Sequence, residues 1–162
     1  ADRMSQAKLT KCGFYGHSQW RSALSAAALE KALAEGEAAS LAATNKKGTR
    51  TLRAIVAAYL SAAHRDEVGS GCAIGALAGE VGRAGSKPRQ IMKRQLEKTF
   101  EETSTLLGDG PEAEGLAMAM WSTMVGAIML SRVFKGEEKS DLILRAARKA
   151  IIELEAGAKT QL

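Results

Sequence analysis

Hydrophobic side chains recur along most of the chain at intervals of three and four residues, the spacing of one face of an α-helix. Glycine, proline, asparagine and serine interrupt this pattern at a few places, where we expect turns. Alternating runs of the kind that predict β-strands do not occur in the sequence. We therefore predict an all-α helical bundle with six main helices, at about residues 20–44, 51–63, 72–84, 87–107, 111–134 and 141–156.

Several residues at the ends of these segments support the assignment. Ser86 and Ser140 stand where N-caps are expected, and Pro88 follows within the next first turn. The stretch 64–71 is polar and contains glycine, so we predict a loop there. Three glycines inside the helix at 72–84 should let neighbouring helices approach closely; they are Gly75, Gly79 and Gly82.

The last two predicted helices are unusually apolar. Residues 115–131 contain no charged side chain, so this helix is apolar almost all round and needs two partners. The final helix carries a broad apolar stripe, formed by Leu142, Ile143, Ala146, Ala147, Ala150, Ile151 and Leu154. We predict a homodimer in which these two helices from each subunit form a four-helix bundle. The alternative is that both helices lie at the centre of a monomer's core.

A membrane span is the less favoured interpretation of residues 115–131. The run is at the short end of spanning length, contains Ser122, Thr123 and Gly126, and ends at Arg132. We expect no membrane association. Cys12 and Cys72, the chain's two cysteines, do not suggest a disulfide framework, which favours a cytoplasmic protein.

Composition agrees with a helical protein, and the charge permits nucleic-acid contact without requiring it. Apolar residues make up 46% of the chain, aromatic residues 4%, and there are only 2 prolines. The net charge is +5, and the first 21 residues contribute +3, because Arg3, Lys8, Lys11 and Arg21 face only Asp2. A basic end of this kind permits contact with DNA.

The N-terminal residues have the layout of a helix-turn-helix. A short helix precedes a turn at Lys8-Leu9, and a second short helix begins with Thr10 as its cap. Residues 9–17 read Leu-Thr-Lys-Cys-Gly-Phe-Tyr-Gly-His and are followed by Arg21 and Leu24. This segment resembles the recognition helix of TetR-family repressors. Residues 58–61, 64–66 and 71–80 resemble the ligand-domain signature of one large branch of that family.

The resemblance implies a small DNA-binding head followed by a larger body for ligand binding and dimerisation. We assign residues 1–20 to a partial helix-turn-helix head, in which the family's first helix is missing, and residues 21–162 to the body. The DNA-binding residues that it implies are Thr10, Lys11, Gly13, Tyr15 and His17. Lys8 and Ser18 depart from the family pattern, which has a turn glycine and a core phenylalanine at these positions.

The body should contain a cavity for a small apolar ligand. Soft methionine side chains and aromatic residues suit a cavity that accepts varied apolar molecules. The residues that we predict to line it are Tyr59, Met92, Leu96, Phe100, Met118, Trp121 and Met124. Methionines such as those of the helix at 111–134 are more often packed in a core than placed in a cavity wall.

Other chemistry finds little support in the sequence. Cys72 opens a helix and follows His64 by eight residues, which would suit a reactive thiol, but a small buried residue explains it better. We predict no metal, cofactor or enzymatic activity. The favoured function is a ligand-responsive, homodimeric DNA-binding regulator, a repressor that acts on a palindromic operator. The alternative is a dimeric helical small-molecule-binding module that no longer reads DNA.

Overall fold

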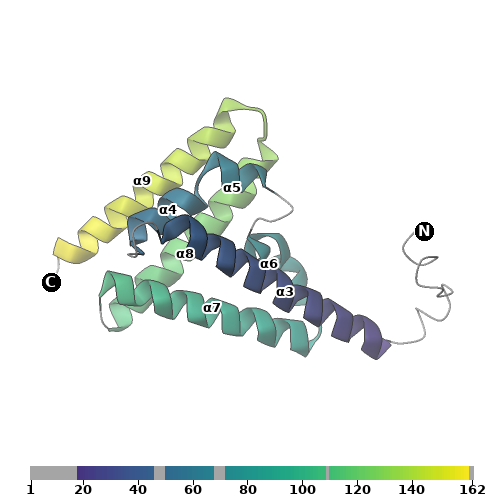
Figure 1. Ribbon diagram of the computed structural model, residues 1–162. Helices are drawn as coiled ribbons and strands as arrows, with labels where there is room; N and C mark the ends of the chain where they lie inside the picture. The colour runs from purple at the N-terminus through teal and green to yellow at the C-terminus, as the bar shows by residue number, and fades with distance from the viewer. Residues whose placement is uncertain (1–17, 46–49, 68–71, 109, 161–162) are drawn as a thin grey trace.

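The computed structural model describes residues 18–45, 50–67, 72–108 and 110–160, and these residues form helices without any strand (Figure 1). The all-α prediction is therefore confirmed. The helices are α3 (Ser18–Thr44), α4 (Leu52–Tyr59), α5 (Ala62–Asp66), α6 (Ala73–Arg83), α7 (Ser86–Leu107), α8 (Pro111–Val133) and α9 (Glu138–Thr160). The predicted helix-turn-helix head lies outside the described residues.

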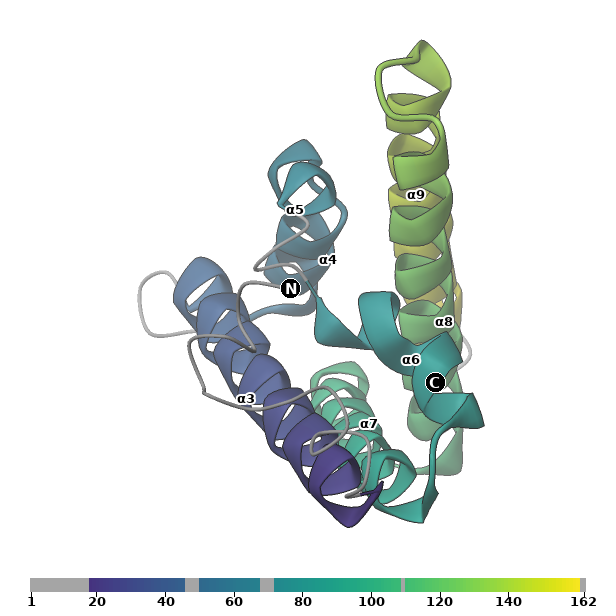
Figure 2. The ribbon, with the colours of Figure 1, turned by 90° about the vertical axis from the view of Figure 1, so that its right-hand side faces the viewer.

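Two helix pairs form the body, and the shorter helices lie between them. Figure 2 shows α8 and α9 side by side and α3 next to α7, with α4, α5 and α6 between α3 and the pair of α8 and α9. One core cluster joins α4, α8 and α9 around Leu60, Met124 and Ile151. A second joins α3, α6 and α7 around Leu33 and Met92. The helix α8 contacts α7 as well as α9 and so connects the two clusters.

The connection between α7 and α8 follows directly from its residues. Gly108 and Gly110 have positive φ angles of 134° and 102°, which side chains other than glycine rarely tolerate. Pro111 then occupies the first turn of α8, where its missing N–H costs nothing. The glycine and proline signals therefore place this boundary correctly.

The chain between residues 51 and 71 differs from the prediction. One helix at 51–63 and a loop at 64–71 were expected, but α4 ends at Tyr59 and a new helix, α5, runs over Ala62–Asp66. The Ser61 hydroxyl causes the restart, because it accepts a hydrogen bond from the His64 N–H at 3.1 Å and so caps α5. Residues 64–66 are thus helical rather than part of a loop.

Two other local predictions were wrong. Ser140 lies inside α9, which begins at Glu138, and its hydroxyl donates to the carbonyl of Ser131 at 2.7 Å instead of capping the helix. Among the glycines of α6, only Gly75 faces close neighbours, since a Cβ there would lie 3.9 Å from the Tyr59 hydroxyl. Gly79 and Gly82 border open space, so they do not serve helix approach.

The helix α8 has a buried side and an exposed side. Met120, Met124 and Ile128 are fully buried, whereas Leu130 is 57% and Val133 76% exposed. By length and composition α8 is also apolar enough to cross a membrane, a test that core helices of soluble proteins pass as well. Its buried side packs against α7 and α9.

Candidate ligand-binding site

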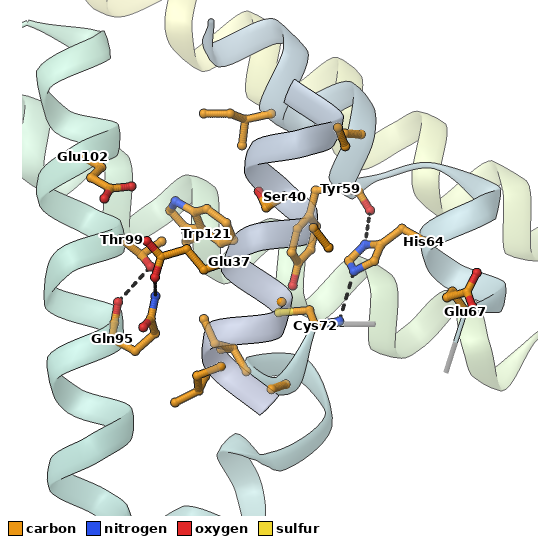
Figure 3. A pocket seen from close by; sticks show the side chains of 18 of the residues that line it. Glu37, Ser40, Tyr59, His64, Glu67, Cys72, Gln95, Thr99, Glu102 and Trp121 are labelled. Atoms are coloured by element: carbon orange, nitrogen blue, oxygen red, sulfur yellow. Dashed lines mark hydrogen bonds between the residues drawn. The ribbon is translucent and has the colours of Figure 1, made fainter. Parts of the chain in front are cut away.

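A cavity of about 640 Å³ lies between α3, α4, α5, α6 and α7, with α8 contributing one side chain (Figure 3). We call it the main cavity because side chains from six helices line it, whereas the larger hollow described below is lined by three. Small and apolar side chains make up much of its wall. Its lining consists of Ala32, Leu33, Gly36, Glu37, Ala39, Ser40, Ala43, Arg50, Ile55, Ala58, Tyr59, Ser61, Ala63, His64, Glu67, Cys72, Ala73, Ile74, Gln95, Thr99, Glu102, Thr103 and Trp121.

Three rings form one wall of the main cavity. Tyr59 lies edge-on to Trp121, with ring centroids 5.2 Å apart and an interplanar angle of 82°. It also lies edge-on to His64, with centroids 4.5 Å apart. Such edge-to-face pairs are favourable because the positive edge of one ring meets the negative face of the other. The wall therefore presents flat apolar surface to a ligand.

The imidazole of His64 is held in one neutral tautomer. Its Nε2 accepts a hydrogen bond from the Cys72 N–H at 3.1 Å, so this nitrogen carries no proton. Its Nδ1 lies 2.6 Å from the Tyr59 carbonyl oxygen and must donate to it. Burial of the ring lowers the pKa of His64 below its ordinary value, which agrees with a neutral imidazole. The contact of His64 with Cys72 is thus to the main chain.

The indole of Trp121 is fixed by a buried chain of hydrogen bonds. Its Nε1–H donates to the Thr103 hydroxyl at 2.8 Å, and that hydroxyl donates to the Thr99 carbonyl at 2.8 Å. Both threonines lie on α7, one turn apart, on the side that faces the main cavity. Because the indole donor is already used, Trp121 offers a ligand its ring surface rather than a hydrogen bond.

Paired charges border another part of the main cavity. Arg50 Nη1 donates to a Glu102 carboxylate oxygen at 2.9 Å, and Lys98 contacts the carboxylates of both Glu37 and Glu102. The hydrogen bond from Lys98 lowers the pKa of Glu37, and the same bond raises the pKa of Lys98. Two carboxylates thus face two cations. In the view of Figure 3, Glu37 and Glu102 lie away from the His64 side of the cavity.

Arginines from the two C-terminal helices hold the junction between α4 and α5. Arg148 of α9 donates to the Leu60 carbonyl at 2.8 Å. Arg132 of α8 donates to the carbonyls of Arg65 at 3.0 Å and His64 at 3.3 Å. These carbonyls are the ones left without partners where helices end. The segment that carries Tyr59 and His64 is therefore tied directly to α8 and α9.

The residues predicted to bind a ligand are not all in one place. Tyr59 and Trp121 line the main cavity. Met92, Leu96, Phe100 and Met118 line a second hollow of about 790 Å³ between α6, α7 and α8. Met124 is fully buried in the core and lines neither hollow. The side of α7 that faces the main cavity is the polar one, with Gln95, Thr99 and Glu102.

The predicted DNA-binding residues, Thr10, Lys11, Gly13, Tyr15 and His17, lie outside the residues that the structure describes. Their assignment stays a prediction.

Sequence reasoning did not single out Thr103, Arg132 or Arg148 for their contacts. Nothing in helical periodicity indicates that a guanidinium will cap another helix at its carbonyl end. The spacing of Arg65 and Asp141, whose side chains pair at 2.5 Å across the same junction, gives no local signal either. The fold alone brings these groups together.

Comparison with known proteins agrees with this architecture. A family model described as tetracyclin repressor-like, C-terminal domain, matches residues 48–147, which is more than half of the chain and includes most of the main cavity. No curated protein matches the chain. The matched region covers α4 to α8 and the first part of α9. The chain therefore belongs to the TetR family of transcriptional regulators.

Proposed function

We propose that this protein is a ligand-responsive, DNA-binding transcriptional repressor that acts as a homodimer on a palindromic operator. The observation that carries the proposal is an uncharged, exposed face along α8, next to α9. Soluble monomers rarely expose a contiguous apolar patch of this kind unless it binds a partner. We call these residues, all of them exposed except the half-buried Gly126, the α8 face: Gly115, Met118, Ala119, Ser122, Gly126, Met129, Leu130 and Val133.

The spacing of exposed residues supports pairing of α8 and α9 with the same helices of a second copy. On α8, Met118, Ser122, Gly126 and Leu130 follow one another at intervals of four. On α9, Leu142, Ala146, Ala150 and Leu154 do the same and are all exposed. Rows with this spacing form the ridges that interlock when helices pack. A two-fold axis would bring each row against the partner's and bury it.

The main cavity supports the ligand-responsive part of the proposal. A cavity of about 640 Å³ with mostly apolar walls and a few fixed polar groups has the size and lining of sites for small molecules. Arg132 and Arg148 connect its α4–α5 wall to the helices that we assign to the dimer. A ligand that moves this wall would thereby bias how two subunits sit together, and so the separation of their DNA-binding ends.

Selection of binding sites from a random duplex library tests the DNA-binding part. We expect the protein to enrich an inverted repeat whose half-sites lie about 34–36 Å or a multiple apart. Its affinity for that duplex should fall steeply with salt, because lysines and arginines displace counterions from phosphates. Lys11→Ala should weaken binding. Weak, equal affinity for every duplex would reject this function and leave a dimeric small-molecule-binding module.

A dimer-breaking variant tests whether two copies act together. Leu130→Glu places a charge in the α8 face, whereas Leu106→Glu makes the same change at an exposed leucine of α7. We expect the first to lose binding to the inverted repeat and the second to keep it. Equal binding by both variants would contradict dimerisation through the α8 face.

A further inference from the structure

The main cavity contains two buried polar atoms that no described residue satisfies. Neither the Tyr59 hydroxyl nor the Arg50 Nε has a hydrogen-bond partner within the described part of the chain, and both residues line the cavity. The Cys72 thiol lies beside the Tyr59 hydroxyl, but a thiol is a weak partner. A buried donor without an acceptor is costly, so a ligand atom that accepts a hydrogen bond there removes that cost.

The residues that carry the two atoms lie at opposite ends of α4. Arg50 precedes the helix, and Tyr59 is its last residue. Eight residues of α-helix rise about 12 Å, which is close to the length of a two-ring molecule. Ile55 and Ala58, which lie between the two donors in sequence, also line the cavity. The wall is therefore apolar in its middle and carries a donor towards each end.

The chemistry of these atoms specifies acceptors on the ligand. The Nε–H of arginine is a donor only, and the tyrosine hydroxyl can donate. Carbonyl or ether oxygens are the common small acceptors that fit both positions.

The charges around the main cavity indicate a neutral ligand. The carboxylates of Glu37 and Glu102 are matched by Lys98 and Arg50, so they leave no counter-charge for a cation. His64 is neutral because both of its ring nitrogens are engaged with the main chain. The remaining lining carboxylate, Glu67, is exposed at the end of α5. Burying a charged ligand against these groups would cost more than it gains.

We propose that the main cavity binds a neutral, largely apolar molecule with an oxygen acceptor at each end, one for Tyr59 and one for Arg50. Its middle lies against the ring of Trp121 and the small side chains of α3. This inference rests on the proposed function only in taking the main cavity as the ligand site.

Four matched biphenyls test the ligand class by equilibrium dialysis. They carry two acetyl, two isopropyl, two aminomethyl or two carboxylate groups at the para positions. Acetyl and isopropyl groups have nearly the same shape, so that pair isolates the oxygen acceptors. We expect the diketone to bind about tenfold more tightly than the hydrocarbon and than either ionic compound. Tighter binding of the diamine or the dicarboxylate, or no binding of the diketone, would overturn the proposal.

Variants locate the site and its donor. Gly36 lies on α3 in the cavity wall, and a Cβ there would meet nothing within 4 Å, so Gly36→Leu should fill the cavity and reduce diketone binding more than tenfold. Gly79→Leu makes the same change at an open glycine of α6 outside the cavity and should change nothing. Tyr59→Phe should weaken binding of the diketone about fivefold and leave binding of the hydrocarbon unchanged. It should not lower the Tm of the protein.

An equal loss for diketone and hydrocarbon in Tyr59→Phe would mean that the hydroxyl has no role in recognition. Failure of the ligand inference is distinguishable from failure of the proposed function, because dimerisation and DNA binding are measured without any ligand. A protein that dimerises and binds an inverted repeat but ignores the diketone would lose only the present inference.

Discussion

Replacing Arg132 by methionine should destabilise the α4–α5 junction. Methionine keeps the aliphatic part of the side chain but removes both donors to the carbonyls of Arg65 and His64. A hydrogen bond from a charged donor contributes about 1.5–3 kcal/mol. The bond to Arg65 is 3.0 Å long and the one to His64 is 3.3 Å, beyond the usual range, so the second counts for little.

The half-buried position of Arg132 lets water replace part of what is lost. We therefore expect Arg132→Met to lower the free energy of unfolding by about 2 kcal/mol. Unfolding entropy for a domain of this size is about 0.3 kcal/mol per degree, so the Tm should fall by about 7 °C. Thermal unfolding followed by circular dichroism measures this, at one protein concentration because dimerisation links Tm to concentration.

Arg145→Met serves as the matched control, because Arg145 is an exposed arginine of α9. Its Tm should change by less than about 2 °C, as for most surface substitutions. Hydrogen exchange gives a second measure, since the amides of Arg65 and Glu67 are bonded within α5 and should exchange faster in Arg132→Met. Equal Tm changes in the two variants, with unchanged exchange in α5, would refute this account of the junction.

Three further changes test other parts of the structure. Thr103→Val keeps the side-chain shape but leaves the Trp121 N–H buried without its acceptor. The free energy of unfolding, measured in urea, should therefore fall by about 1–3 kcal/mol. An unchanged urea midpoint would contradict the buried hydrogen bond. Burial lowers the pKa of His64 in the folded protein below the ordinary imidazole pKa of 6.5. Near and below that pH the unfolded chain therefore binds more protons than the folded one. The free energy of unfolding should fall as the pH drops, by at most about 1.4 kcal/mol per pH unit. His64→Gln should flatten this dependence between pH ~7.5 and ~5.5, and identical profiles would disprove it. Gly79→Ala, at an exposed helical position with open space, should raise the free energy of unfolding by about 0.5–1 kcal/mol in the same urea assay. A lower free energy of unfolding would mean that the added methyl group meets a neighbour.

The sequence predicted the long helices well because their signals are local. Gly108, Gly110 and Pro111 mark one boundary through backbone conformation alone. The break before α5 was missed because Leu60, Ala62 and Ala63 continue an apolar helical pattern on both sides of Ser61. Only the capping hydroxyl of Ser61 and the arginines that bind the freed carbonyls explain why the chain turns there.

The cavity was harder to predict because periodicity identifies the faces of a helix but not their neighbours. Tyr59 and Trp121 were recognised as aromatic candidates, and the structure brings their rings within 5.2 Å. On α7 the apolar residues were chosen, yet the polar side with Gln95, Thr99 and Glu102 lines the main cavity. That outcome depends on how α3 crosses α7, which no local pattern records.

The most direct test of the central claim is the mass of the protein in solution, measured by light scattering at micromolar concentration. We predict about 34 kDa, twice the 17.1 kDa of one chain, for the protein and for Leu106→Glu. We predict a mass close to that of one chain for Leu130→Glu. A mass of one chain for the unmodified protein would contradict a regulator that dimerises through α8 and α9.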